Sequence, residues 1–418
     1  MKDADSSAKI DQIASWLVEQ AFGDPNMKLL LKEMCERIVA AGIPIARAMV
    51  NWTTLHPLYH VEMLIWRNGS GMTFDRIPFS PDNQPTAEWL RSPLRALVEG
   101  PVPFIRHRLV GPERQHDFPV LDEFAAAGMT DYIAFATALN TPGARVRDYP
   151  AGVVSSFTTA APDGFDANQI EQLRRLHKRF ALVSKTIILT GIMRTLTRTY
   201  LGSHAGERVL SGQIRHGDGD ALPAVIWFSD LRRSTEYISR MPQDEFIRLL
   251  NEYFDCTAGA VMLHGGDVLD FIGDGVIAIF PIVAGDHDKA ARHALAAVDE
   301  SHRRLAELNA RREASGREPI AFGIGLNEGE VLFGNIGIAE RMVFSIIGPT
   351  VNALARIEAM TKELDVTTLA TKAIARQAPG RWEPAGEHLL RGFDAPVALY
   401  ALRQAELPQA LQALTAPA

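Results

Sequence analysis

Residues Gly265 to Phe280 read GGDVLDFIGDGVIAIF, two apolar runs joined at Gly273-Asp274-Gly275. A Gly-Asp-Gly turn between apolar, β-branched runs is a strong signal for a tight β-hairpin. Because the two strands of a hairpin pair side by side, this stretch predicts an antiparallel sheet in the C-terminal half of the chain. The turn also places Asp274 near the end of a neighbouring strand.

A second apolar strand is predicted in the segment AVIWFSDLRRST, residues 224–235, and it ends at Asp230 before a helix start. Each aspartate alone has an ordinary explanation, since Asp230 could cap the next helix and Asp274 could be a turn residue. The two together are more informative, because paired carboxylates repel each other unless a cation lies between them.

Three more segments follow in the C-terminal half. Residues 321–337, AFGIGLNEGEVLFGNIG, predict another pair of strands with small residues at the turns, and they contain no P-loop. Residues 344–358, FSIIGPTVNALARIE, predict a strand that breaks at Gly348-Pro349 and a helix with Asn352 and Arg356 on one face. Residues 388–400, HLLRGFDAPVALY, predict a terminal hairpin that carries Arg391.

In this order, the five segments resemble the catalytic domain of class III adenylyl and guanylyl cyclases, over residues 222–402. The resemblance implies a ferredoxin-like α+β domain, with an antiparallel sheet flanked by helices. It implies that Asp230 and Asp274 bind two Mg²⁺ or Mn²⁺ ions, with the backbone carbonyl of Leu231 as a further ligand. One ion would activate the ribose 3′-hydroxyl, and the other would hold the triphosphate and offset charge on the departing pyrophosphate.

The same resemblance implies roles toward the nucleotide. Asn352 would orient the ribose, and Arg356 would stabilise charge on the α-phosphate in the transition state. Arg391 stands where the family usually has a lysine that contacts the terminal phosphates. Family domains work as head-to-tail dimers that share their active sites, so one domain with both residue sets predicts a homodimer. Without the resemblance, Arg356 and Arg391 would be a solvated helix face and a solvated turn.

Asp270 and Ser345 occupy the two positions that set base choice in the family. Ser345 is close to the Thr of many bacterial adenylyl cyclases, whereas Asp270 is unlike their Lys. An ionised carboxylate only accepts hydrogen bonds, which favours guanine with its N1–H and 2-amino donors. Alternatively, Asp270 points to solvent or pairs with an arginine, and the backbone reads the base. We take ATP, giving cyclic AMP, as the leading substrate and GTP as the runner-up, with a pyrimidine nucleotide still open.

The sequence disfavours two other functional classes. A catalytically inactive cyclase fold that serves as a binding module is disfavoured, because Asp230, Asp274, Asn352 and Arg356 are all present. A metal-dependent phosphodiesterase or nuclease is disfavoured, because the 12 histidines are scattered rather than clustered.

The N-terminal half reads as a separate α+β domain. Helical spacing covers residues 9–43, strands are expected over 46–67, 130–139 and 151–159, and a loop rich in Gly, Asn and Pro follows residue 67. A strand, a Pro-Asp-Gly turn and a long helix close the domain, a layout that resembles a GAF-type sensor. The resemblance implies regulation by a small-molecule ligand; the alternative is that this domain only sets dimer geometry.

The long helix is expected over residues 167–201, capped by Asp166. It is either a parallel signalling helix in a dimer or a surface helix of its own domain. The chain therefore divides into a regulatory domain at 1–165, a signalling helix and linker at 166–221, a catalytic domain at 222–402 and a disordered tail at 403–418.

Composition points to a cytoplasmic protein. A net charge of −7 argues against a nucleic-acid partner. Cys35 and Cys256 are the only cysteines, which excludes a disulfide framework and favours a reducing compartment. The start MKDADSSA lacks the apolar core of a signal peptide. The longest apolar stretch, residues 180–193, is too short to span a bilayer and contains Lys185, so no membrane partner is expected.

Overall fold

The computed structural model describes residues 2–80, 84–112, 114, 117–139, 145–146, 149–150, 152–338, 340–391 and 393–412. The chain divides into two compact units, Met1–Leu196 and Thr197–Ala418.

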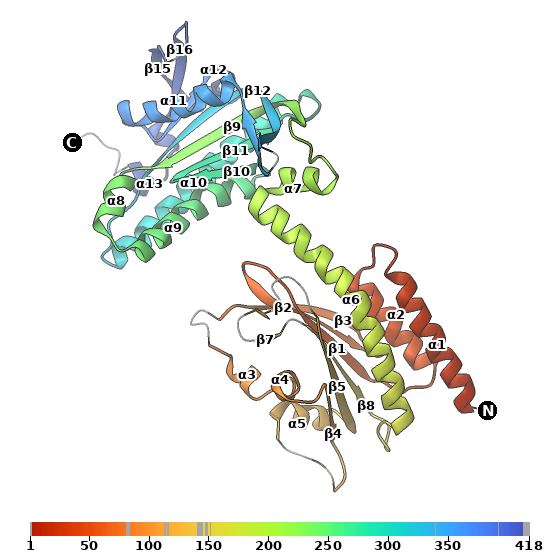
Figure 1. Ribbon diagram of the computed structural model, residues 1–418. Coiled ribbons are helices and arrows are strands. Elements are labelled where there is room, and N and C mark those ends of the chain that lie inside the picture. The colour runs from red at the N-terminus through yellow and green to blue at the C-terminus, as the bar shows by residue number, and fades with distance from the viewer. Residues whose placement is uncertain are drawn as a thin grey trace. The chain divides into compact units, whose positions relative to one another are not determined.

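A six-stranded antiparallel sheet forms the centre of the N-terminal unit (Figure 1), in the order β3-β2-β1-β8-β5-β4. Its strands are β1 (Arg47–Thr53), β2 (Tyr59–Arg67), β3 (Gly71–Pro78), β4 (Phe104–Arg108), β5 (Asp131–Ala138) and β8 (Gly152–Thr159), and β6 (Arg145–Val146) pairs with β7 (Tyr149–Pro150) apart from it. The prediction of a loop after residue 67 is therefore wrong for residues 71–78, which form β3. Gly69 and Gly71, both at positive φ, make a tight turn there, and β3 returns along β2.

Helices cover both faces of this sheet. Alternate residues of β5 face opposite ways, with Ile133 and Phe135 in one core and Tyr132 and Ala134 in the other. The first core is closed by α1 (Lys2–Gln20), α2 (Met27–Ala40) and α6 (Ala167–Leu201), and the second by α4 (Pro93–Glu99) and α5 (Pro119–Ala126), with α3 (Ala87–Leu90) preceding α4. The helical run expected over 9–43 is broken before Asn26, whose side chain caps α2.

Helix α6 has the predicted bounds, Ala167–Leu201. Asp166 Oδ1 accepts from the backbone N–H of Gln169 at 2.7 Å, and the Gln169 side chain accepts in return from Asp166 N, which forms a capping box. Among the described helices, α6 is long and apolar enough to cross a membrane, judged by length and composition alone. This judgement uses an 18-residue window of the helix, which is longer than the apolar stretch at residues 180–193. Only 33% of that apolar window is buried, although Leu173, Leu176 and Phe180 of the same helix are fully buried in the N-terminal core. The cytoplasmic location stays a prediction.

The C-terminal unit is built on an eight-stranded sheet in the order β10-β11-β9-β12-β14-β16-β15, with β13 also paired to β12. Its strands are β9 (Gly219–Leu231), β10 (Asp267–Ile272), β11 (Gly275–Pro281), β12 (Phe322–Ile338), β13 (Arg341–Ile347), β14 (Thr368–Thr371), β15 (Trp382–His388) and β16 (Val397–Leu402). All pairings are antiparallel except β12 with β14. The antiparallel sheet and the α+β class agree with the sequence prediction.

Helices lie on both faces of this sheet as well (Figure 1). Val225 and Trp227 of β9 pack with α9 (Gln243–Leu263) and α10 (His287–Ala314), whereas Ala224 and Ile226 pack on the opposite face with α11 (Pro349–Glu363) and α7 (Ser203–Leu210). The remaining helices are α8 (Ser234–Arg240), α12 (Lys372–Ala375) and α13 (Gln409–Gln412), with short 3₁₀ turns at Val283–Gly285, Pro379–Arg381 and Gln404–Glu406.

Three expectations differ from this structure. Residues 321–337 were expected to form two strands, but β12 is one continuous strand. Its glycines serve close approach rather than turns, since a Cβ on Gly334 would lie 2.5 Å from Gly219 Cα. The linker expected at 202–221 contains α7 and the start of β9. The tail expected to be disordered from 403 is folded as far as residue 412, because Leu407 and Leu411 are buried in the C-terminal core; residues 413–418 lie outside the described part.

Candidate active site

Asp230 and Asp274 meet at one edge of the C-terminal sheet. β10 and β11 form the predicted hairpin around Gly273, which has a φ of +65°, and Gly275 pairs with Asp230 across β11 and β9. Asp274 is thereby held beside the end of β9. Burial raises the pKa of Asp230, the Lys362 ammonium opposes that rise, and the nearby Asp274 carboxylate adds to it.

Lys362 is a member of this site that the sequence analysis missed. Its Nζ lies 2.9 Å from Asp230 Oδ2, and it belongs to the last turn of α11. Its position ten residues after Asn352, on the same predicted helix, was the only signal in the sequence. Recognising it requires knowing that α11 packs across the end of β9.

A buried carboxylate, Glu358, fastens α11 to the same strand end. The Glu358 side chain is only 4% exposed, and its Oε1 lies 3.6 Å from Arg232 Nη1. Arg232 also donates a hydrogen bond to Thr361 Oγ1, and Thr361 Oγ1 lies 3.3 Å from Glu358 Oε1. Burial and the charge of Asp230 raise the pKa of Glu358 to about 7, against the opposing effect of Arg232. Glu358, Arg232 and Thr361 were also not predicted.

Asn352 and Arg356 lie one turn apart on α11, as expected. Asn352 is exposed, and Arg356 Nη1 donates to the Asn352 backbone carbonyl at 2.6 Å. Among the described residues, no hydrogen bond or ion pair joins either side chain to Asp230 or Asp274. Arg391 is exposed in the turn between β15 and β16, so the predicted terminal hairpin is present. The fold thus brings the two aspartates together, and no described hydrogen bond or ion pair links Asn352 or Arg356 to them.

Asp270 lies on β10 and Ser345 on β13, two strands that approach each other without pairing, since β10 pairs with β11 and β13 with β12. Asp270 is exposed, and its Oδ1 accepts from the backbone N–H of Phe271 at 2.8 Å, just after a bulge in the β10–β11 pairing. One carboxylate oxygen therefore remains for another donor. Ser345 is half-buried opposite Gly334 of β12.

The two aspartates suit a hard divalent cation. Carboxylate and carbonyl oxygens are the ligands that Mg²⁺ prefers, and the buried Leu231 follows Asp230 directly. Within the described residues, no group of three or more His, Cys, Asp or Glu side chains could hold a metal. A metal at this pair would therefore complete its coordination with backbone, water or substrate oxygens, as Mg²⁺ commonly does. The donor chemistry fits Mg²⁺ or Mn²⁺.

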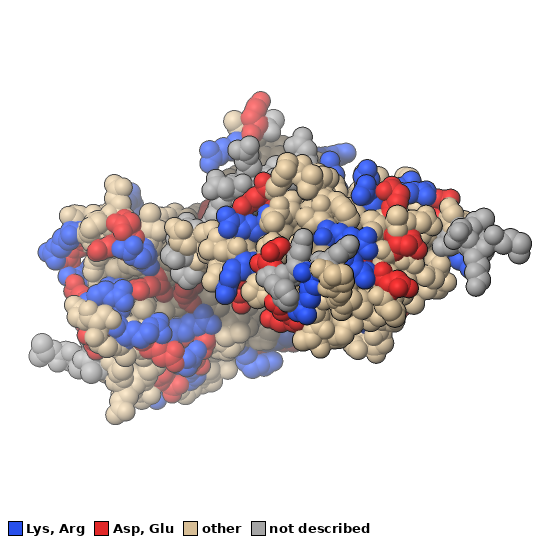
Figure 2. Space-filling model, turned by 90° about the horizontal axis from the view of Figure 1, so that it is seen from below, with Lys and Arg blue, Asp and Glu red and all other residues tan. Residues whose placement is uncertain are grey.

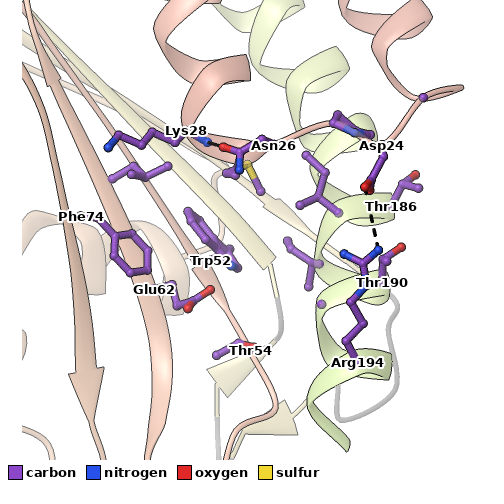
Figure 3. A pocket seen from close by; sticks show the side chains of 17 residues that line it. Asp24, Asn26, Lys28, Trp52, Thr54, Glu62, Phe74, Thr186, Thr190 and Arg194 are labelled. Carbon is purple, nitrogen blue, oxygen red and sulfur yellow. Dashed lines mark hydrogen bonds and ion pairs between the residues drawn. The ribbon is translucent and has the colours of Figure 1, made fainter. Parts of the chain in front are cut away.

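A separate pocket of about 460 Å³ lies in the N-terminal unit. Figure 3 shows it between α6, the α1–α2 connection and strands β1 to β3. Trp52 and Phe74 supply aromatic surface. The charged lining residues are Asp24, Lys28, Glu62 and Arg194, of which Asp24 and Arg194 approach to 3.9 Å. The pocket combines apolar surface with charges of both signs.

Acidic and basic side chains are intermixed on the face of the molecule in Figure 2, over the described residues that it colours. Nucleic-acid binders usually gather Lys and Arg on one face. The absence of a nucleic-acid partner stays a prediction.

Comparison with known proteins identifies the C-terminal domain. Residues 221–404 match the family model for the adenylate and guanylate cyclase catalytic domain. This part of the chain is therefore a class III adenylyl/guanylyl cyclase catalytic domain, as the five segments predicted. The N-terminal unit lies outside this match, so its GAF resemblance stays a prediction.

The chain is 29% identical over 177 residues to adenylate cyclase 1 of Rhizobium meliloti, covering 41% of this chain and 26% of that protein. It is 31% identical over 163 residues to an adenylate cyclase of Anabaena cylindrica, covering 39% and 32%. The chain thus spans less than half the length of these curated relatives. Among solved structures, the guanylyl cyclase Cya2 is 30% identical, with a TM-score of 0.40, covering 46% of this chain and 95% of that one.

Proposed function

We propose that the C-terminal domain converts ATP into 3′,5′-cyclic AMP and pyrophosphate. The observation that carries the proposal is the closeness of the Asp230 and Asp274 carboxylates at one sheet edge, inside a domain that matches the cyclase family. The reaction is an in-line attack of the ribose 3′-hydroxyl on the α-phosphate, which depends on positioning and charge stabilisation.

Each residue has a defined task. Asp230, Asp274 and the carbonyl of Leu231 would hold two Mg²⁺ or Mn²⁺ ions, which would supply activation of the hydroxyl and neutralisation of the triphosphate. Asn352 would hold the ribose so that its 3′-oxygen lies in line with the α-phosphate. Arg356 would donate to the oxygens on which charge develops. Arg391 would bind the terminal phosphates through its planar guanidinium.

We propose a homodimer with shared sites, which the placement of these residues supports. The Asn352 side chain is exposed on α11, with no described contact to the aspartates of its own chain. A second copy packed head to tail can bring its own Asn352 and Arg356 to Asp230 and Asp274, which completes two sites per dimer.

For the base, the half-buried Ser345 and the relatives named adenylate cyclase support ATP. The exposed Asp270, which can only accept hydrogen bonds when ionised, favours GTP as the alternative. A second alternative is an inactive cyclase fold that acts as a binding module.

The test is to incubate the full-length protein with Mn²⁺ and ATP, GTP, CTP or UTP separately and to identify products by mass. Asp230→Ala is the control. We expect cyclic AMP from ATP and no cyclic product from the variant. A larger yield from GTP would make the domain a guanylyl cyclase. No product from any nucleotide, for the full chain and for residues 197–418, would support the binding module.

We also propose that the N-terminal unit regulates this activity. Thr190 and Arg194 of α6 line the pocket in Figure 3, and α6 itself runs across the boundary between the two units. A ligand with a planar group for Trp52 and Phe74 and an anionic group for Lys28 suits the lining. Regulation requires that such a ligand bind the active and inactive arrangements differently. A difference in turnover per site between the full chain and residues 197–418 would support regulation by the N-terminal unit. Equal turnover would contradict this regulation.

A further inference from the structure

Lys362 supplies a positive charge at the point where the proposed metal site needs one. Its Nζ is 2.9 Å from Asp230 Oδ2, a charge-assisted hydrogen bond. The Lys362 side chain is 49% exposed and that of Asp230 is 22% exposed, so the pair lies at the boundary between protein and solvent. An isolated surface pair of this kind contributes little to stability. This pair differs because Asp230 also lies beside Asp274.

The charges around Asp230 show why Lys362 matters. Asp230, Asp274 and Glu358 are acidic, and Arg232 and Lys362 are basic. Arg232 is engaged with Glu358 and Thr361. Of the described side chains, Lys362 is therefore the cation that hydrogen-bonds the Asp230 carboxylate. Without it, Arg232, which interacts with Asp230 at longer range and is engaged elsewhere, would be the cation left to offset the repulsion between Asp230 and Asp274.

The backbone of Lys362 is fixed, but its ammonium can move. Glu358, Arg232 and Thr361 fasten α11 against the end of β9, one turn before Lys362. The lysine itself is a flexible four-carbon arm that carries a strongly hydrated point charge. It can therefore leave Asp230 for water without moving the helix.

A metal ion and the Lys362 ammonium compete for the same oxygen. Mg²⁺ binds carboxylate oxygens at about 2.0–2.1 Å, inside the space that an ammonium at hydrogen-bond distance occupies. A divalent ion bound there would also repel the ammonium. We propose that Lys362 is a resident counter-ion that holds Asp230 until the metal displaces it, and that it thereby weakens the binding of free Mg²⁺ or Mn²⁺. The inference rests on the proposed metal-binding role of Asp230 and Asp274.

The test measures Mn²⁺ binding to the full-length protein without nucleotide, by calorimetry and by the loss of free-Mn²⁺ electron paramagnetic resonance signal. Lys362→Met removes the charge and keeps the apolar stem. Lys372→Met, at an exposed lysine of α12, is the matched control. We expect Lys362→Met to lower the Kd for Mn²⁺ roughly threefold to tenfold. We expect Lys372→Met and Lys362→Arg to stay within about twofold of the parent, because an exposed lysine away from the site has little effect and arginine keeps the charge.

Thermal melting provides a second readout that does not need catalysis. Lys362→Met should melt lower than the parent without metal and should gain more from saturating Mn²⁺, because a ligand that binds the folded state more tightly stabilises it more. An unchanged or higher Kd in Lys362→Met, with Asp230→Asn unable to bind Mn²⁺, would overturn the role of Lys362 alone. Full Mn²⁺ binding by Asp230→Asn would overturn the proposed metal site and this inference with it.

Discussion

Asp274 directly precedes Gly275, the residue that pairs with Asp230 across β11 and β9, so the hairpin turn itself brings two carboxylates to one sheet edge. Such an arrangement opposes folding, since burial and Asp274 both raise the pKa of Asp230. Sites that keep unfavourable charges together commonly do so for function, at some loss of stability.

The first prediction separates stability from metal binding at this pair. Asp274→Asn removes a repulsive charge next to Asp230 while keeping the shape of the side chain. We expect its melting temperature without metal to equal or exceed that of the parent protein, and the rise caused by Mn²⁺ to disappear. Thermal melts with and without Mn²⁺ measure both. A lower melting temperature without metal would mean that Asp274 stabilises the turn, and an unchanged Mn²⁺ effect would exclude it as a ligand.

How far the sequence predicts this site depends on the range of the interactions. The hairpin at Gly273 and the capped helix at Asp166 are local, and both were predicted with nearly the right bounds. The contact of Lys362 with Asp230 joins residues 132 positions apart, and it exists only because α11 packs over the end of β9. No local pattern encodes that packing, which is why Lys362, Glu358 and Arg232 were missed.

For the glycines of β12, by contrast, the sequence predicted local turns that the structure does not contain. The small residues of 321–337 were expected at turns between two strands, but β12 pairs with β9 from Phe322 to Gly334 without interruption. A Cβ on Gly329 would lie 2.8 Å from Thr350 at the start of α11. The glycine is there because a helix approaches the strand, a tertiary requirement that composition alone does not distinguish from a turn.

The second prediction concerns shared active sites. Asp230→Ala and Asn352→Ala should each be inactive alone, because each lacks one half of both sites. Mixed in equal amounts with free subunit exchange, they should recover about a quarter of parent activity, since half the dimers carry one intact site. A mixture of Asp230→Ala with Asp274→Ala is the matched control and should recover nothing. Differently tagged chains must co-purify; if they do and no activity returns, the sites are not shared.

The third prediction tests base choice at Asp270. Lysine can donate to N1 of adenine, where guanine instead presents an N1–H donor. Asp270→Lys should therefore shift the cyclic AMP to cyclic GMP ratio toward cyclic AMP by about threefold to tenfold, in competition between equal ATP and GTP. Asp288→Lys, at an exposed position of α10, controls for the change in net charge. An equal ratio in both variants would mean that the backbone, and not Asp270, reads the base.

The fourth prediction concerns acid sensitivity of the N-terminal unit. His177 is buried, stacks on Phe135 and hydrogen-bonds Thr137 and Ser155, and burial lowers its pKa to about 4. Between its unfolded pKa of about 6.5 and a pKa of about 4, only the unfolded chain binds the proton. Stability contributed by neutral His177 is therefore complete above about pH 6.5 and lost as the pH falls toward 4, by about 2–3 kcal/mol.

Urea unfolding at several pH values measures this slope. His177→Leu should be less stable at neutral pH, because Thr137 and Ser155 lose their partner. Its stability should nevertheless fall less between pH 6.5 and 4 than that of the parent. His302, buried in the C-terminal core with a pKa also lowered to about 4 by burial, keeps a second contribution in both proteins. Identical slopes in parent and variant would show that His177 does not carry the effect.

The last prediction links the packing of α11 to catalysis through Gly323 of β12. A Cβ at this position would lie 2.5 Å from Glu358 Oε1 and 2.7 Å from Arg232 Nη2, and closer still to Thr361 Oγ1. Gly323→Ala must therefore push apart the residues that fasten α11 to β9. Overpacking of this kind costs about 1–3 kcal/mol. Since α11 carries Asn352, Arg356 and Lys362, the same shift should lower kcat more than it raises KM for the nucleotide.

Gly380→Ala, where a Cβ meets nothing within 4 Å, is the matched control and should change stability by less than about 0.5 kcal/mol. A destabilised Gly323→Ala protein with parent kcat would show that catalysis does not depend on this seating of α11.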